Sequence, residues 1–178
     1  MCHDRARLAD APENIHLDIE YVPTPYIVVD KMLEVANLSE RDVLYDLGCG
    51  DGRVVIAAAL NWGARAIGFD LDPVRLAEAR ASIAAAEVGD LVEIVEANLL
   101  EVDLRAATVV TLYLSPELNL QLLPALRQLA PGSRIITHDF LIGEIDPDEL
   151  WTVTAEHFKP RPKAREHAVL RWTTPLIG

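Results

Sequence analysis

The sequence predicts an α/β fold built on a mostly parallel sheet. Apolar, strand-like runs alternate with helical patterns over residues 43–138, as they do where helices join parallel strands. Two further alternating runs, residues 151–155 and 167–172, follow each other with no helical pattern between them, which indicates an antiparallel hairpin. Five strands with connecting helices and a terminal hairpin predict a sheet of seven strands.

The first predicted elements are an extended lead-in, a helix and a buried strand. Residues 21–26 contain two prolines, which fix an extended backbone. Residues 27–37 have the apolar spacing of a helix, which we expect to lie beside the first strand. That strand is the apolar run at residues 43–47, which leads into a glycine-rich turn, and helical spacing resumes over residues 54–61.

A second strand is predicted at residues 65–70, where the pattern becomes apolar again after the helix. Asp72 and Pro73 then provide a side chain that can cap a helix and a proline suited to its first position. The helix is expected to continue to about residue 87.

The remaining core elements follow the same alternation. Residues 91–96 alternate like a third strand, and the continuous apolar run at residues 107–112 predicts a fourth strand in the centre of the sheet. A leucine-rich helix is expected to begin at Pro116, and Pro124 should kink or divide it. Residues 133–138 predict the fifth strand.

Length, charge and cysteine content limit the class of protein. The 178 residues suggest one domain, residues 21–178, after an N-terminal extension of residues 1–20. The net charge of −12 argues against a chain that coats nucleic acid, and no apolar run approaches the roughly 20 residues of a membrane span. Residues 1–20 resemble no signal or transit peptide, so we expect a cytoplasmic protein. Two cysteines offer neither a disulfide framework nor zinc spacing, and no metal is expected.

The glycine-rich turn, DLGCGDG at residues 46–52, points to a nucleotide-like ligand. A turn of this kind at the carboxyl end of a strand needs glycines because the backbone bends sharply and the ligand comes close. A dinucleotide fingerprint would need glycine where Arg53 stands, and no P-loop triplet occurs in the chain. The carboxylate of Asp46 would repel a phosphate and attract an amino group. S-adenosylmethionine, which carries an ammonium and a sulfonium but no phosphate, fits these conditions.

The DLGCGDG run resembles motif I of the class I S-adenosylmethionine-dependent methyltransferases. Asp70 lies 24 residues after Asp46, close to the offset at which nucleotide-binding sheets place a carboxylate on the ribose hydroxyls. In these methyltransferases an aspartate often accepts from the adenine amino group at the position of Asn98, whose amide oxygen can also accept. Cys49 is interpreted as a small packing residue.

Several segments together narrow the resemblance. Residues 21–24 (YVPT), 44–53 (LYDLGCGDGR), 108–116 (TVVTLYLSP) and 131–135 (PGSRI) are similar to the bacterial relatives of the mitochondrial protein-lysine methyltransferases of the ATP synthase c-subunit type. The resemblance covers roughly residues 21–145. It implies a Rossmann-like class I methyltransferase sandwich, with a seven-stranded, mostly parallel sheet and a C-terminal antiparallel hairpin.

The resemblance also implies the roles of particular residues. Pro23 and Thr24 would close over the cofactor, and Tyr113 would face the incoming nucleophile. Asp139, at the end of the fifth strand, is a candidate to take a proton or to anchor an ammonium, although a role in stabilising the fold is also open. The residues expected to contact the cofactor are Pro23, Thr24, Asp46, Gly48, Cys49, Gly50, Asp70, Leu71, Asn98 and Leu99.

The expected partner is a protein substrate with an accessible lysine, without stable binding of nucleic acid. Acidic residues within 144–149 are expected to lie on the cleft side of the sheet, where they would attract a cation, or to be a solvated loop. The basic segment 159–165 is either a partner contact or a soluble hairpin tip. Two other functions stay open: methylation of a small molecule or RNA, and binding of S-adenosylmethionine without turnover.

Overall fold

The computed structural model describes residues 21–157 and 163–177, and the predicted N-terminal extension lies outside these residues. The helices, in chain order, are α1 (Tyr26–Val35), α2 (Arg53–Trp62), α3 (Pro73–Ala86), the short 3-10 helix η1 (Leu99–Glu101) and α4 (Pro116–Leu126). The strands are β1 (Val43–Leu47), β2 (Arg65–Asp70), β3 (Val92–Glu96), β4 (Val109–Leu112), β5 (Arg134–His138), β6 (Glu149–His157) and β7 (Lys163–Thr173).

These seven strands form one sheet with the order β3-β2-β1-β4-β5-β7-β6. Strands β1 to β5 are parallel, while β7 runs antiparallel to both β5 and β6. The order reverses between β1 and β4, so β4 occupies the centre, as its apolar sequence predicted. The predicted fold class is therefore confirmed.

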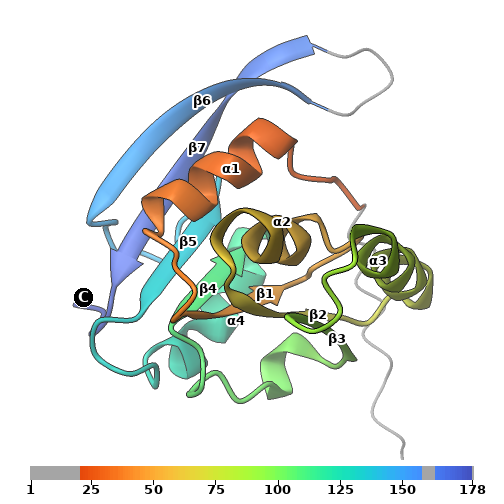
Figure 1. Ribbon diagram of the computed structural model, residues 1–178. Coiled ribbons are helices and arrows are strands. Elements are labelled where there is room, and N and C mark those ends of the chain that lie inside the picture. The colour runs from red at the N-terminus through yellow and green to blue at the C-terminus, as the bar shows by residue number, and fades with distance from the viewer. Residues whose placement is uncertain (1–20, 158–162, 178) are drawn as a thin grey trace, which may run out of the picture.

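Helices cover both faces of the sheet and enclose two cores (Figure 1). On one face α1 and α2 pack through residues such as Val28 and Val55 on sheet residues such as Ile136. On the other face α4 packs through its leucines, including Leu118, Leu122 and Leu126, as the leucine spacing indicated. Burial of these two layers fixes the sheet and holds the carboxyl ends of β1, β2, β4 and β5 along a common edge, which we call the carboxyl edge.

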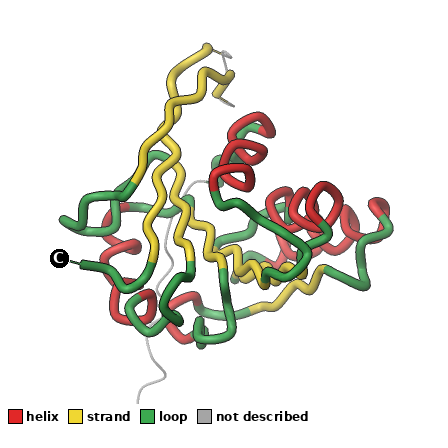
Figure 2. Tube along the Cα trace, turned by 60° about the vertical axis from the view of Figure 1, so that its left-hand side comes forward, coloured by secondary structure: helices red, strands yellow, loops and turns green. Residues whose placement is uncertain are grey.

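The hairpin of β6 and β7 extends past the carboxyl edge (Figures 1 and 2). The last residue of β5, His138, pairs with Val169, whereas β6 and β7 remain paired from there to His157 and Lys163. Both strands are thus longer than the sequence predicted. The segment predicted to be a basic hairpin tip is partly strand, and its residues 158–162 lie outside the described part of the chain.

Pro124 was predicted to kink or divide the leucine-rich helix, and it does not divide it. Helix α4 continues through Pro124 and ends at Leu126. A proline removes one donor and crowds the preceding turn, but so close to the carboxyl end of a helix little of the hydrogen-bonding pattern remains to be disrupted.

The predicted position of the acidic segment 144–149 is also wrong in part. The amide of Thr173 donates a 2.6 Å hydrogen bond to Asp148, and Glu149 forms a 3.3 Å ion pair with Arg171. Thr173 pairs with Arg134 at the amino end of β5, so this part of the segment lies at the edge of the sheet opposite the glycine turn. The reason is that β7 inserts between β5 and β6, which makes β6 start at the amino end of β5.

No helix in the described ranges 21–157 and 163–177 is long and apolar enough to cross a membrane.

Candidate active site

The glycine turn joins β1 to α2 at the carboxyl edge and is fixed to the end of β2. The amides of Gly48 and Cys49 both donate to the carbonyl of Phe69, at 2.9 and 3.0 Å. Gly48 has φ +82°, in the left-handed region that favours glycine, and a Cβ there would lie 2.8 Å from Cδ2 of Leu114. The backbone therefore follows a path that a residue with a side chain would strain.

Asp46, the last acidic residue before the turn, is almost completely buried. Its side chain accepts a 2.7 Å hydrogen bond from Oγ1 of Thr111 on β4. Burial raises the pKa of the Asp46 carboxyl to about 7, an effect that Thr111 opposes and the nearby carboxylates of Asp70 and Asp51 increase. A cationic group beside this carboxyl would stabilise its ionised form, so the site favours a ligand with an ammonium.

Asp70 ends β2 and its carboxylate closes the turn from the other side. Its Oδ2 accepts from the amide of Gly50 at 2.9 Å, and its Oδ1 accepts from the amides of Leu71 and Asp72 at 2.8 and 3.0 Å. A carboxylate has about four lone-pair sites, so these three contacts leave capacity for a ligand hydroxyl. The contact of Asp70 with the cofactor ribose stays a prediction. The structure shows in addition that Asp70 stabilises the turn through its hydrogen bond with Gly50.

The lead-in segment lies over the glycine turn. A Cβ at Gly50 would lie 2.4 Å from Cε2 of Tyr21, which places the tyrosine ring directly against the glycine. Arg53, at the start of α2, donates a 2.7 Å hydrogen bond to the carbonyl of Thr24. The segment that contains Pro23 and Thr24 is thus attached to the turn, in line with the predicted covering of the cofactor.

Cys49 is buried within the turn, beside Gly68 of the neighbouring strand. A Cβ at Gly68 would lie 2.8 Å from Sγ of Cys49, so the thiol fills the space that the glycine leaves. Burial, together with the carboxylates of Asp46 and Asp70, raises the pKa of the thiol. The interpretation of Cys49 as a packing residue agrees with this environment.

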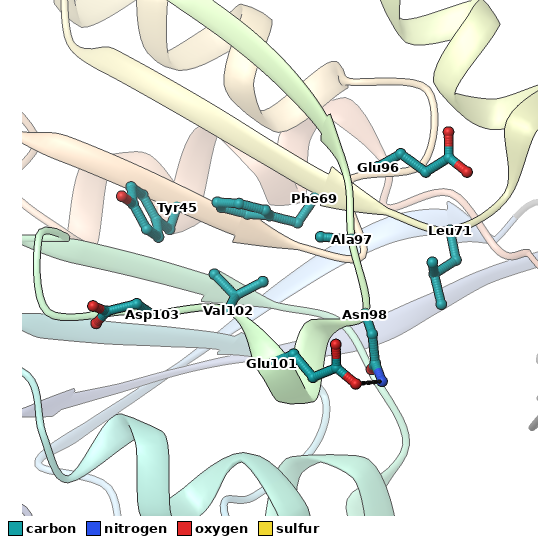
Figure 3. Close-up of a pocket in the computed structure, with 9 residues that line it drawn as sticks. All are labelled: Tyr45, Phe69, Leu71, Glu96, Ala97, Asn98, Glu101, Val102 and Asp103. Atoms are coloured by element: carbon teal, nitrogen blue, oxygen red, sulfur yellow. Dashed lines mark hydrogen bonds between the residues drawn. The ribbon is translucent and has the colours of Figure 1, made fainter. Parts of the chain in front are cut away.

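A pocket of about 820 Å³ opens beside the ends of β2 and β3 (Figure 3). It includes two residues predicted to contact the cofactor, Leu71 and Asn98; Leu99 begins η1 directly after them. Oδ1 of Asn98 accepts from the amide of Leu100 at 3.1 Å, and its Nδ2 donates to Glu101 at 3.1 Å, so its amide is already oriented. The full lining is Tyr45, Phe69, Leu71, Glu96, Ala97, Asn98, Glu101, Val102 and Asp103.

The charges around the turn and the pocket fit S-adenosylmethionine. Asp46 and Asp70 flank the turn, and Glu96 and Glu101 line the pocket; none of these four forms an ion pair with an arginine or lysine of the described residues. Such a set repels phosphate and favours a ligand with positive charge. The apolar parts of the pocket wall would suit a flat aromatic base.

Tyr113 and Asp139, the two predicted catalytic residues, lie close together at the ends of β4 and β5. Burial and the carboxylate of Asp139 raise the pKa of the Tyr113 hydroxyl. Burial alone would raise the pKa of Asp139, but Arg165 donates a 2.6 Å hydrogen bond to its Oδ2 and lowers it. The amide of Ala168 donates to Oδ1 at 2.9 Å. Asp139 therefore binds β7 and is a weak base.

Sequence reasoning missed two buried histidines beside this pair of residues. The ring of His138 lies 3.9 Å from the ring of Tyr113, centroid to centroid, and His138 Nε2 is 2.8 Å from Nδ1 of His167. Thr24 Oγ1 is 3.2 Å from Nδ1 of His138. The position of His138 at the end of a predicted strand was the available signal, whereas the register that brings His167 to it is not visible in the sequence.

A family model described as the ANTKMT methyltransferase domain matches residues 46–149, which is more than half of the chain. The matched range begins at Asp46 and includes the glycine turn, Asp70, Tyr113 and Asp139.

Three individual proteins show the range of the similarity. The chain is 43% identical over 134 residues to a protein-lysine N-methyltransferase of Saccharolobus islandicus (strain REY15A), which covers 74% of this chain and 83% of that protein. It is 28% identical over 155 residues to the Homo sapiens lysine N-methyltransferase of the ATP synthase c-subunit, covering 82% and 65% respectively. The crystal structure of an RNA methyltransferase from Salinibacter ruber in complex with S-adenosyl-L-homocysteine superposes with a TM-score of 0.76 at 48% identity, over 86% of this chain and 94% of that one.

Proposed function

The chain belongs to the ANTKMT methyltransferase family, and on this premise we propose that it methylates the side-chain amine of a lysine in a protein substrate. The family resemblance seen in the sequence is confirmed, and the chain is an S-adenosylmethionine-dependent methyltransferase. Membership of the family establishes methyl transfer, and lysine as the acceptor is our proposal.

One observation carries the choice of acceptor: the relative from Saccharolobus islandicus, a protein-lysine N-methyltransferase, is 43% identical over most of this chain. The electrostatics support it. The chain has a net charge of −12, and Asp46 and Asp70, neither of which pairs with an arginine or lysine of the described residues, lie along the carboxyl edge. A lysine ammonium approaching this edge is attracted, and the attraction does not depend on the sequence around the lysine.

For this reaction the protein has mainly to position the methyl donor and the amine and to exclude water. The bound cofactor would supply a methyl group on a positively charged sulfur. The amine nitrogen would attack the methyl carbon in line with the carbon–sulfur bond, and the sulfur would leave as a thioether. In this assignment Asp46 and the glycine turn hold the amino-acid end of the cofactor, and Asp70 holds its ribose. Tyr113 and Phe140, whose rings are 6.1 Å apart and nearly parallel, border the place where the amine arrives. Holding both reactants at reacting distance removes much of the entropic barrier.

Methylation of RNA is the second candidate, because the neighbour from Salinibacter ruber, at 48% identity, is an RNA methyltransferase. The charge of this chain opposes it. Proteins that hold RNA present lysine and arginine to the phosphates, whereas Arg53 and Arg165 beside this site are each paired with an aspartate, Asp51 and Asp139. We therefore place the protein substrate first.

A labelling experiment separates the two acceptors. The purified protein is incubated with tritium-labelled S-adenosylmethionine and a cell lysate, one half treated with ribonuclease and the other with protease. Label that survives ribonuclease, disappears with protease and is recovered as methyl-lysine after acid hydrolysis supports the proposal. Label that disappears with ribonuclease instead contradicts it. The Asp46→Asn variant serves as the control for transfer that depends on the cofactor site.

A further inference from the structure

We propose that Thr24, His138 and His167 form a proton relay that accepts the proton a lysine ammonium must lose before it can be methylated. The inference rests on the proposed function, since an amine acceptor arrives protonated at neutral pH. It assigns a chemical task to three buried polar side chains that lie beside the cofactor turn.

The relay begins at the carboxyl edge and leads into the protein. Thr24 is 6% exposed, whereas His138 and His167 are completely buried, so the threonine is the member closest to the surface. The carbonyl of Thr24 is fixed by Arg53, the first residue of the helix after the glycine turn. The ring of His138 lies against Tyr113 at the end of β4. The outer end of the relay therefore lies between the cofactor turn and the place where the acceptor arrives.

The two imidazoles point directly at each other. Their facing nitrogens, His138 Nε2 and His167 Nδ1, are 2.8 Å apart, and their ring centroids are 5.0 Å apart. The difference of about 2.2 Å is close to the sum of two ring radii, so the ring axes lie nearly along the line between the nitrogens. Two acceptor nitrogens would repel each other at this distance, and a single proton shared between them makes the contact favourable.

The same cluster has the composition of a metal site, since His138, His167 and Asp139 each offer a ligand atom within 4.8 Å of the others. Its geometry favours a hydrogen bond instead. Rings that bind one metal ion direct their nitrogens at the ion and not at each other. Moreover, Oδ2 of Asp139, the oxygen that faces both histidines, already accepts a hydrogen bond from the guanidinium of Arg165.

The charges around the histidine pair, His138 and His167, favour the uptake of a proton. Oδ2 of Asp139 lies 3.3 Å from His138 Nε2 and 3.9 Å from His167 Nδ1, so its negative charge stabilises an imidazolium at either ring. Arg165 on the same oxygen opposes this in part and keeps Asp139 ionised. Tyr113, whose hydroxyl has a raised pKa, adds a neutral ring against His138.

Apart from Asp139 and Arg165, the residues that pair with the two histidines across the strands are apolar. On β6 the residue opposite His167 is Val153, and on β7 the residue opposite His138 is Val169. Helix α1 packs on the same strands through an apolar face that includes Val28 and Val29. Apolar side chains screen charges poorly. The stability of a charged imidazole in the pair therefore depends strongly on the nearby charges of Asp139 and Arg165.

The relay moves one proton from the lysine ammonium to His167. An N–H bond of the lysine ammonium breaks as its proton passes to Oγ1 of Thr24, and the threonine O–H proton passes to Nδ1 of His138. His138 then gives the proton on its Nε2 to Nδ1 of His167, which becomes an imidazolium beside Asp139. The lysine nitrogen keeps the electron pair and becomes the nucleophile. This order requires His138 to carry its neutral-state proton on Nε2 and His167 to accept at Nδ1.

Two variants interrupt the relay with little change in shape. Thr24→Val removes the hydroxyl, and His167→Asn keeps an acceptor near the position of Nδ1 but cannot take up a proton. Thr174→Val is the matched control, because Thr174 is also buried and donates a hydrogen bond, to Ala130, at the amino end of the sheet. Circular dichroism and S-adenosylmethionine affinity, measured first, show whether each variant folds and keeps the cofactor site.

The decisive measurement is the pH profile of single-turnover methylation, with the ribonuclease-treated lysate proteins as the acceptor. Removal of general-base assistance costs about 10²-fold or more, so at pH 7 both relay variants are expected to fall by this factor. Their rates should rise as the pH approaches about 10, where a lysine deprotonates without help. Thr174→Val should follow the wild-type profile.

The tautomers of His138 and His167 can be determined without a methyl acceptor, by ¹⁵N NMR of the histidine rings. A proton on Nε2 of neutral His138 supports the relay, and a proton on its Nδ1 overturns it, as would stoichiometric zinc in the purified protein. If the wild type labels lysine and the relay variants keep its pH profile, the relay is wrong and the proposed function stands. If the wild type labels no lysine, both are wrong.

Discussion

Oγ1 of Thr111 on β4 donates a 2.7 Å hydrogen bond to the carboxyl of Asp46 on β1, inside the sheet and directly before the glycine turn. Because burial raises the pKa of Asp46 to about 7, this carboxyl is partly protonated near neutral pH. A bound ammonium needs it ionised. Cofactor affinity should therefore increase by up to about tenfold per unit between about pH 5.5 and 7, a range in which an α-amino group stays protonated.

Isothermal titration calorimetry with S-adenosylmethionine at several pH values tests this dependence. In buffers of different ionisation enthalpy near pH 7, binding should also release a fraction of a proton. The Asp46→Asn variant should bind weakly, and its affinity should lose the pH dependence. A wild-type affinity that stays constant across the range would show that Asp46 is already ionised in the free protein.

The raised pKa of Asp46 also predicts how stability depends on pH. The folded value of about 7 lies above the ordinary 3.8, so between these values the folded state binds more protons than the unfolded state. The contribution of Asp46 to stability is therefore present at low pH and is lost as the pH rises through this window. Relative to wild type, Asp46→Asn should gain stability at pH 8 and lose that advantage near pH 4. Urea unfolding of both proteins at these pH values measures the difference between their free energies of unfolding. The contributions of the other carboxyls are the same in both proteins and cancel.

The backbone of the glycine turn can be tested with a pair of alanine substitutions. Gly48→Ala places a side chain at φ +82° with its Cβ 2.8 Å from Leu114, so it should destabilise the fold by about 1–2 kcal/mol and weaken cofactor binding strongly. Gly89→Ala is the control, because a Cβ at that position meets nothing within 4 Å. The control should stay within about 0.5 kcal/mol of wild type. Equal effects of the two substitutions on cofactor affinity would contradict the assigned site.

The parts of this molecule that sequence predicted well depend on local chemistry. The second strand, predicted at residues 65–70, is Arg65–Asp70 in the structure, and Asp72 caps α3 by accepting from the amides of Val74 and Arg75. The glycine turn was also identified from local chemistry, because its residues are consecutive in the sequence. The residues predicted at the turn, Asp46 to Gly50, do lie together with Asp70, while their contact with the cofactor stays a prediction.

The parts that were missed depend on register and strand direction. His138 and His167 are 29 residues apart and meet only because β7 pairs with β5. The interpretation of the acidic segment as a rim of the cleft placed Asp148 and Glu149 at the wrong edge, because the sequence of a hairpin does not tell which of its strands joins the sheet. Arg165 was predicted to lie in a partner contact or a soluble hairpin tip, and it instead pairs with Asp139, because β7 continues past the end of β5.

The buried thiol of Cys49 should be unreactive in the folded protein. Its pKa is raised by burial, and only the thiolate reacts with disulfide reagents. In a Cys2→Ser background, an aromatic disulfide reagent should therefore label no thiol under native conditions and one thiol after denaturation. Rapid labelling of the native protein would show that the turn opens. Cys49→Ala should keep cofactor affinity within a few-fold, because the turn contacts of this residue come from its backbone amide.

The buried ion pair between Arg134 and Asp42 should stabilise the amino end of the sheet without affecting the active site. Arg134 also donates to the carbonyls of Ala36 and Asn37, at 3.0 and 3.2 Å, so it joins the end of α1 to β5. Arg134→Met leaves the carboxylate of Asp42 buried with hydrogen bonds from Ser39 and Thr108 alone, and should lower the free energy of unfolding by about 2 kcal/mol. Asp42→Asn in the same chain should recover part of this loss, because it removes the unpaired charge.

Arg105→Met is the matched control for that substitution, since Arg105 pairs with Asp103 at 2.6 Å where both side chains are well exposed. Exposed pairs contribute little because water already solvates both charges, so this variant should unfold like the wild type. Urea unfolding measures the stability of all the variants, and titration with S-adenosylmethionine should give the wild-type affinity for Arg134→Met. If Arg134→Met and Arg105→Met lowered stability equally, burial of the Arg134–Asp42 pair would not be the cause. If Arg134→Met reduced cofactor affinity in the folded protein, the two edges of the sheet would have to be coupled.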